Sequence, residues 1–556
     1  MNKYWVLFCF LYFLSPTLTA ERQPFVPDVT HQVFRDRIVE FVRASAEEHI
    51  QQAPLAELNQ LERHWDNHYQ RTNWQITVSA YYQGDLVGKG YANGKDLTST
   101  LRQSTLKAMQ SNPDVDDATM ANYRFKIDFD FHPSRRYSII DFEGNGLESL
   151  GHRVAVRSVD TTVIQNQIDA SLAYLLRQQD PQLKGFFKFY NADKDQAESL
   201  LRTTYSATAL YTLIKLNNLQ PDTAIESRFA DIADFLLARQ LKTGPHAGGF
   251  DYGYNPDTGK GTCRIVVGTT SKTIYTLLLM NQLYPDNPVY LNAAKAAGDW
   301  LLSMIKEDGN VIPIARCKDG EWTLKDKQSF LYTGQVLSAL SRLYADTDET
   351  SYLDGARRIA ALLLKEVDEQ GPLVADDYRP ANSISSSWVM MSLIDLAKVD
   401  PKPVYRRTII QIANTLLERQ IVSQSDLFSH GRYLDAMTTS GNGWINEVMG
   451  DWYEFCSMQK LTDCQPYREA MHRTSRWLVQ NAYTPQNSYD IANPTRAHGG
   501  MITNFNTWTV RTDAVCHALN GLISLLRIEA GNDARLIELP AQPLREILPL
   551  LRAGND

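Results

Sequence analysis

The chain lacks the sequence features by which several classes of protein are recognised. Its charges are interspersed without a lysine- or arginine-rich block, and the formal net charge is −8 over 556 residues, so we expect no nucleic-acid partner. It has no GxGxxG, P-loop, HExxH or GxSxG motif, which disfavours nucleotide binding, zinc proteolysis and serine-hydrolase chemistry. It also lacks any run of about eighteen consecutive apolar residues, the length that crosses a bilayer as a helix.

Cysteine is scarce, and its positions favour disulfides over a metal site. None of the six cysteines forms a CxxC pair or has a histidine at the spacing of zinc ligands, so we expect no metal ion and no cofactor. Cys456 and Cys464 flank a short connection between predicted helices, and Cys263 and Cys317 lie in long loops. Each of these two pairs is a candidate disulfide. Cys516 lies on an apolar helix face and is expected to be a buried free thiol.

The N-terminus has the pattern of a secretory signal. Lys3 precedes an apolar run from Tyr4 to Leu14 that is too short to span a bilayer stably, and Ala20 is a small residue at the expected cleavage point. We interpret residues 1–20 as a cleaved signal peptide, with an uncleaved membrane anchor as the alternative. Cleavage would release an exported protein, periplasmic or secreted, without a membrane span, into a compartment that permits disulfides.

Residues 21–155 have the mixed pattern of a small α/β domain. The predicted helices are 31–49 and 96–110, and the predicted strands are 74–87 (a hairpin), 123–131 and 137–142. The string from Ile76 to Leu97, ITVSAYYQGDLVGKGYANGKDL, resembles the AMME-region family, in which a strand, a turn and a glycine-rich strand precede a helix. The cysteine-containing motif of that family is absent, and Gly88-Lys89-Gly90 stands where a reactive residue is expected. We therefore predict a binding or structural module that docks to envelope proteins.

From residue 156 to residue 530, two kinds of helical segment alternate. Segments of mixed polarity occupy 163–177, 224–240, 290–306, 351–366, 403–420 and 466–481. Segments richer in small and apolar residues occupy 199–217, 269–284, 329–344, 384–398, 442–459 and 511–527. Because the second kind is apolar on nearly every face, we expect it to form buried inner helices, with the first kind outside.

The connections between these helices alternate in length as well. Those leading from an outer to an inner helix are long, whereas most of those returning are short, and a closed ring would place all the long loops at one end, where long loops usually serve function. This organisation resembles the (α/α)6 toroid superfamily, which implies a carbohydrate-active cleft at that end. We predict a mainly α protein, an (α/α)6 toroid of about twelve helices, preceded by the α/β domain and followed by a tail at 531–556. An open helical solenoid is the alternative.

The long loops and the helix starts that follow them concentrate side chains suited to binding sugars. Tyrosine and tryptophan offer flat faces to sugar rings, and arginine binds a uronate carboxylate through two hydrogen bonds. The candidate catalytic residues are Asp251, Asp377, Tyr378, Tyr433, Glu447 and His498. The candidate substrate-binding residues are His246, Tyr252, Arg264, Arg379, His430, Arg432, Trp444, Trp508, Arg511 and Asp513. His517, one turn into the last inner helix, is expected to be a core histidine.

These residue types leave several chemistries open. Hydrolysis would use two opposed carboxylates, such as Asp251 or Asp377 with Glu447, whereas β-elimination or epimerisation would use a tyrosine or histidine of the same loops as base. We predict an exported enzyme that processes a polysaccharide or oligosaccharide, including uronate-containing ones. The alternatives are a non-catalytic glycan-binding or assembly scaffold of the envelope and a helical scaffold that binds peptides.

Overall fold

The computed structural model describes most of the chain from Gln32 to Glu529. The described residues are 32–51, 70–82, 85–110, 120, 123–132, 135–140, 149–150, 153–154, 156, 158–422, 430–436, 438–460, 463–485, 488, 491–503 and 509–529. The predicted signal peptide and C-terminal tail therefore lie outside the described residues, as does Trp508. Within the described part of the chain, no helix is long and apolar enough to cross a membrane.

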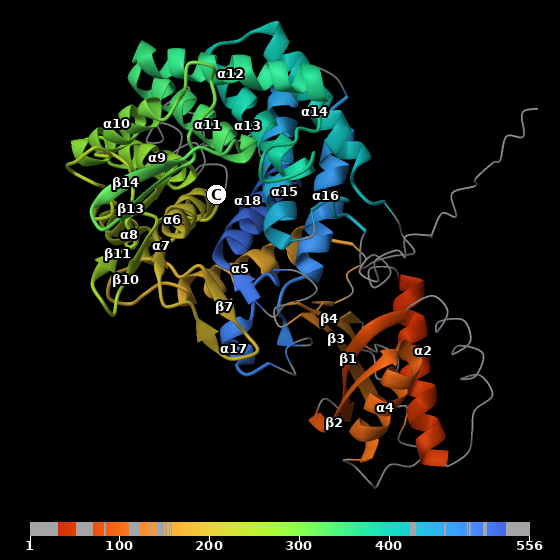
Figure 1. Ribbon diagram of the computed structural model, residues 1–556. Helices are drawn as coiled ribbons and strands as arrows, with labels where there is room; N and C mark the ends of the chain where they lie inside the picture. Colours follow the sequence, from red (N-terminus) through yellow and green to blue (C-terminus); the bar gives the residue numbers. More distant parts are fainter. Residues whose placement is uncertain are drawn as a thin grey trace, which may run out of the picture.

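The N-terminal unit is an antiparallel sheet with two helices, as the alternating patterns predict (Figure 1). Its elements are α2 (Gln32–Gln51), β1 (Gln70–Tyr82), β2 (Asp85–Asp96), α4 (Leu97–Gln110), β3 (Tyr123–His132) and β4 (Arg135–Ile140), and the strand order is β2-β1-β3-β4. A Cβ at Gly90 of β2 would lie 2.0 Å from the carbonyl oxygen of Ser104 in α4. The glycine-rich strand is therefore explained by direct packing of the helix on its backbone.

The second unit consists of helical hairpins around a common centre (Figure 1). The inner helices are α6 (Thr203–Leu219), α9 (Val267–Leu283), α11 (Phe330–Thr347), α13 (Ser383–Val399), α15 (Thr439–Gln459) and α18 (Thr512–Glu529). The outer helices are α5 (Thr161–Arg177), α8 (Phe229–Leu237) with the short α7 (Thr223–Glu226) before it, α10 (Pro288–Ser303), α12 (Thr350–Gln370), α14 (Pro403–Glu418) and α16 (Gln465–Gln480). Most residues of the inner helices are buried, whereas the outer helices keep an exposed stripe, as predicted from their composition.

Short strands and one short helix occupy the long loops. The strands are β7 (Phe189–Asn191), β8 (Gln196–Ala197), β9 (Leu201–Arg202), β10 (Gly253–Asn255), β11 (Lys260–Gly261), β12 (Arg264–Val266), β13 (Ile314–Lys318), β14 (Glu321–Lys325) and β15 (Thr509–Arg511), and the helix is α17 (Pro494–Ala497). Two further strands, β5 (Ser149–Leu150) and β6 (Arg153–Val154), precede α5.

Helix α15 starts earlier than predicted. The Thr438 side chain caps it by accepting from the amide of Gly441, and Asn442, at which the predicted segment began, lies inside the helix.

The ring of hairpins is closed, which excludes the open solenoid. Helix α18 packs against both α15 and α6, and β15, which precedes α18, pairs with β7, which follows α5. Gly499 lies so close to α5 that a Cβ there would be 2.0 Å from the carbonyl oxygen of Ala170. Gly248 and Gly431 approach the backbones of the outer helices α10 and α16 equally closely. The last hairpin therefore contacts the first as neighbouring hairpins contact each other elsewhere.

Two disulfides join the cysteine pairs that the sequence analysis selected. Cys456 and Cys464 link the end of α15 to the start of α16, and Cys263 and Cys317 link the loop before β12 to β13. Cys516 is a buried free thiol, and burial raises its pKa.

Candidate functional site

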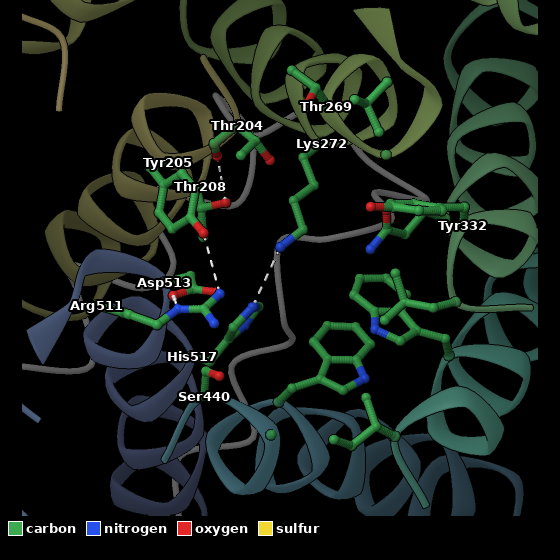
Figure 2. A pocket seen from close by; sticks show the side chains of 18 of the residues that line it. Thr204, Tyr205, Thr208, Thr269, Lys272, Tyr332, Ser440, Arg511, Asp513 and His517 are labelled. Atoms are coloured by element: carbon green, nitrogen blue, oxygen red, sulfur yellow. Dashed lines mark hydrogen bonds and ion pairs between the residues drawn. The ribbon is translucent and has the colours of Figure 1, made fainter. Parts of the chain in front are cut away.

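A cavity of about 410 Å³ opens among the first turns of the inner helices (Figure 2). Each inner helix contributes side chains spaced three or four residues apart, which lie on one helix face. The lining residues are Thr204, Tyr205, Thr208, Tyr252, Val266, Gly268, Thr269, Lys272, Leu331, Tyr332, Gln335, Arg379, Ile384, Trp388, Thr438, Ser440, Gly441, Trp444, Arg511, Asp513 and His517. A smaller pocket of about 30 Å³ shares five of these residues and continues one turn deeper, to Glu447 and Asn520.

A hydrogen-bonded line of three ionisable side chains crosses the floor of the cavity. The Glu447 carboxylate lies 2.7 Å from Nδ1 of His517, and its other oxygen accepts from the Asn520 amide at 2.9 Å. Nε2 of His517 lies 3.3 Å from Nζ of Lys272, which reaches across from α9 (Figure 2). Burial lowers the pKa of Lys272, although the nearby carboxylates Asp513 and Glu447 oppose that shift. Glu447 thus orients the imidazole of His517 through Nδ1, and the second ring nitrogen, Nε2, faces Lys272 in the cavity.

An arginine–aspartate pair occupies the adjacent wall. Arg511 of β15 donates two hydrogen bonds to Asp513, at 3.0 and 2.6 Å, and a third to the hydroxyl of Tyr205 at 3.1 Å (Figure 2). Burial alone would raise the pKa of Asp513, but the Arg511 guanidinium outweighs it and the pKa is lowered. Asp513 is therefore ionised, and both of its oxygens accept hydrogen bonds from Arg511.

Two stacked indoles form the opposite wall. The rings of Trp388 on α13 and Trp444 on α15 are 3.5 Å apart and inclined by 11°, and Trp444 is fixed by a hydrogen bond from its Nε1 to Ser387. The edge of Trp444 also contacts the His517 ring, with 5.3 Å between ring centroids. Together with Tyr332 and Tyr252, which line the same cavity, these rings give it an aromatic surface.

The structure brings part of the predicted set together in this cavity. Tyr252, Arg379, Trp444, Arg511 and Asp513 line it, and Glu447 lines the smaller pocket below. The remaining described candidates line neither space: His246, Asp251, Arg264, Asp377, Tyr378, His430, Arg432, Tyr433 and His498.

Two predicted catalytic carboxylates hold loop backbone in place. Asp251 accepts hydrogen bonds from the amides of Gly253, Thr262 and Cys263. Asp377 accepts from the amide of Gln328 at 2.8 Å, and its neighbour Asp376 accepts from the amide of Phe330. Their oxygens therefore bind main-chain donors, and none of the three residues lines the cavity.

The other candidates outside the cavity lie in the loops around it. Arg432 donates to the carbonyl oxygen of Tyr433 at 3.2 Å, and Tyr433 is fully buried, which raises its pKa. His246 is buried beside Trp300, whose Nε1 lies 3.2 Å from its Nδ1, and burial lowers its pKa. His498 is exposed, and its pKa is lowered by partial burial and by the nearby Arg177. The main-chain carbonyl oxygen of His430 accepts a hydrogen bond from Arg476.

Several cavity residues were not singled out from the sequence. His517 was expected to be a core histidine, and Lys272, Trp388 and Tyr205 were not selected. The available signal was spacing: Asp513 and His517 lie four residues apart at the start of an otherwise apolar helix, and Lys272 is the one charged residue of α9. In the part of the chain that the structure describes, no three His, Cys, Asp or Glu side chains are placed to hold a metal ion.

Comparison with known proteins identifies the architecture. No family model and no curated protein matches the chain. A cellobiose 2-epimerase from Bacillus thermoamylovorans matches it with a TM-score of 0.51 at 13% identity, over 66% of this chain and 99% of that one. The second unit is an (α/α)6 toroid.

Other solved structures share this toroid. D-mannose isomerase matches with a TM-score of 0.50 at 13% identity, over 66% of this chain and 98% of that one. A GH76 α-mannanase from Bacteroides thetaiotaomicron matches with a TM-score of 0.51 at 12% identity, over 67% of this chain and 100% of that one. At these identities the likeness establishes the fold, and the chemistry depends on the side chains.

Proposed function

We propose that the protein is an exported enzyme that epimerises or isomerises a sugar by moving a proton at a carbon next to its carbonyl group. The observation that carries this proposal is the line from Glu447 through His517 to Lys272 at the floor of an aromatic cavity. Export is supported by the pattern of residues 1–20 and by two disulfides, which form in oxidising compartments.

His517 is the proposed base. A carboxylate only accepts hydrogen bonds, so Glu447 holds the imidazole proton on Nδ1 and leaves the lone pair of Nε2 for the substrate. Nζ of Lys272 lies within hydrogen-bond distance of this Nε2. With a sugar bound, the same amino group is placed to donate to the carbonyl oxygen and to stabilise the negative charge that develops there as the proton leaves.

Hydrolysis is less well supported by the carboxylates that face the cavity. Of the described residues lining the two spaces, Asp513 and Glu447 are the only acids. A glycosidase needs a protonated carboxyl group and a second, opposed carboxylate. Asp513 is kept ionised by Arg511, and both oxygens of Glu447 accept hydrogen bonds from neighbouring side chains. Neither group is placed to protonate a leaving oxygen.

The names of the structures with this fold fit the proposal without carrying it. One is a sugar 2-epimerase, one a sugar isomerase and one a mannanase, so the toroid accommodates several carbohydrate chemistries. The choice among them for this chain rests on the imidazole and the amino group in the cavity.

Solvent exchange tests the proposal directly. The mature protein would be incubated in D2O with a panel of aldoses, ketoses and reducing oligosaccharides, and NMR would follow deuterium entering the carbon next to the carbonyl group. Reducing ends and absorbance near 235 nm would be recorded in parallel, since they report hydrolysis and β-elimination. We expect deuterium incorporation, reduced by at least about 100-fold in His517→Gln because general-base catalysis is lost.

The chain provides a matched control. His472 on the outer helix α16 also pairs with a glutamate, since its Nε2 lies 2.8 Å from Glu529, but it is outside the cavity. His472→Gln should leave deuterium exchange unchanged. New reducing ends without deuterium incorporation would replace the proposal with hydrolysis, and binding of glycans without any reaction would favour a non-catalytic scaffold.

A further inference from the structure

A group of cationic side chains surrounds Tyr378 beside the cavity. We call it the basic rim, and it consists of Arg264, Arg316, Lys325, Lys327 and Arg379. Arg379 itself lines the cavity, and both Arg264 and Arg379 act electrostatically on Tyr332 of the cavity wall. The rim is therefore continuous with the proposed sugar site.

The aromatic rings of this region hold the cations in place. Nζ of Lys327 lies 4.3 Å from the centroid of the Tyr378 ring, and Nζ of Lys325 lies 5.8 Å from it. The guanidinium carbon of Arg264 lies 4.8 Å from the centroid of the Tyr252 ring, which lines the cavity. Such cation–π contacts orient a charge without neutralising it.

The two arginines face each other across neighbouring strands. Arg264 of β12 is the register partner of Arg316 of β13, directly beside the disulfide between Cys263 and Cys317. Like charges directly opposite in an antiparallel pair are destabilising. The strand β14 that continues this sheet is also anchored, because Trp322 packs on the ring of His246 with 4.7 Å between centroids. Covalent and aromatic anchors thus keep an electrostatically unfavourable arrangement together.

The positive charge of the rim is only partly compensated by the acids nearby. Among the described residues, none of the five cations forms an ion pair, and Nε of Arg264 is buried without a hydrogen-bond partner. Asp376 and Asp377 act electrostatically on Tyr378 and offset part of this charge, but their carboxylates accept from the amides of Phe330 and Gln328 and form no ion pair with a rim cation. A buried donor without a partner beside several unpaired cations indicates a site that an anionic group completes.

We infer that the basic rim binds an anionic substituent on the sugar unit next to the one held in the cavity. This inference rests on the proposed function and specifies its substrate class as an acidic oligosaccharide. A uronic acid carboxylate and a sulfate ester share the required chemistry, since both present planar or tripodal oxygens that arginine and lysine bind with charge-assisted hydrogen bonds. Stacking on Tyr332 or Tyr252 would position the ring that carries the group.

Calorimetric titration tests the rim without requiring turnover. The ligands would be a uronate trisaccharide, a neutral trisaccharide and a sulfated neutral trisaccharide, each titrated at low and at high salt. We expect the best acidic ligand to bind at least about tenfold more tightly than the neutral one at low salt, with the difference shrinking at high salt. Whichever acidic ligand binds more tightly identifies the substituent.

Matched variants separate the rim from general charge effects. The double variant Lys325→Gln and Lys327→Gln changes two rim residues that do not line the cavity, and it should weaken acidic binding by about 10- to 100-fold and change neutral binding less than about twofold. Arg407→Gln, which removes an exposed arginine of the outer helix α14, should change neither.

Acidic binding no tighter than neutral binding, or an equal loss for both ligands in the double variant, would overturn the inference. The proposed function fails separately: if acidic ligands bind through the rim but no sugar exchanges deuterium, the rim stands and the epimerase does not. Deuterium exchange with neutral sugars and no preference for acidic ones would support the epimerase and overturn the rim.

Discussion

Gly499 lets the loop before α18 pack directly on α5 where the toroid closes, and its replacement should reveal how much this contact contributes to stability. Gly499 lies in the loop before α18 with φ of 84°, and the position of its missing Cβ is 2.0 Å from the Ala170 carbonyl oxygen and 2.9 Å from the Ser171 amide nitrogen of α5. Ser171 also donates to the Gly499 carbonyl oxygen at 2.8 Å. The substitution Gly499→Ala therefore pushes the last hairpin away from the first.

The expected loss has three parts. A non-glycine residue in the left-handed region costs about 1–2 kcal/mol. Insertion of a methyl group here costs about 1–3 kcal/mol, because the atoms that it meets belong to the main chain of α5 and cannot move aside as a side chain would. Weakening of the hydrogen bond from Ser171 adds up to about 1 kcal/mol. We expect Gly499→Ala to lower the free energy of unfolding by about 2–6 kcal/mol in total.

Gly244 supplies the matched control. It has φ of 89°, but no atom lies within 4 Å of its missing Cβ. Gly244→Ala should therefore cost only the conformational part, about 1–2 kcal/mol. Guanidinium unfolding under non-reducing conditions, followed by near-ultraviolet circular dichroism, would give the midpoint for each variant. Equal midpoint shifts for the two variants would refute the role of the contact between the loop and α5.

Three further predictions concern residues that do not line the main cavity. Burial raises the pKa of Asp346 to about 6 from its usual 3.8, so the folded state holds a proton that the unfolded state releases. Stability is therefore lost as the pH rises from about 4 to 6. In urea unfolding, Asp346→Asn should be about 1–2 kcal/mol more stable than the parent at pH 8 and equal to it at pH 4. Asp395→Asn breaks a buried ion pair in which Nε of Arg342 lies 2.9 Å from Oδ2 of Asp395, with side chains 4% and 0% exposed. The change should lower the free energy of unfolding by about 3–5 kcal/mol. A second change, Arg342→Met, should restore part of that loss in the same unfolding assay. Replacement of Cys263 and Cys317 by serine opens a loop of 54 residues and should cost about 4 kcal/mol, and an unchanged denaturation midpoint would contradict this.

The helical part of the fold was predictable because buried helix faces require apolar residues at helical spacing, and this spacing is visible in the sequence. The inner helix expected at 384–398 spans Ser383–Val399, and the one expected at 329–344 spans Phe330–Thr347. The start of α15 was not predictable in the same way. Thr438 and Asn442 are both suitable caps in sequence, and tertiary contacts decided between them, because the Asn442 side chain binds the amide of Tyr433 and the carbonyl oxygen of Ala436.

The candidate site was predictable only in part, since its groups come together from distant segments. His517 meets Glu447 from 70 residues away and Lys272 from 245 residues away. A histidine on an apolar helix carries no local mark of such partners. Conversely, Asp251 and Asp377 lie in loops rich in glycine and tyrosine, as binding residues do, but their oxygens are turned to main-chain amides.

The place of the ring closure also determines when the site can exist. The cavity wall on one side of the closure carries Tyr205 from α6, and the wall on the other side carries Arg511 and His517 from the last hairpin. A nascent chain therefore has most of the toroid but no complete site until its final helix has been made and has docked on the first hairpin. Truncation before His517 would remove the proposed base together with most of α18, the ring neighbour of α6, so such shortened chains should be inactive even where their remaining helices fold.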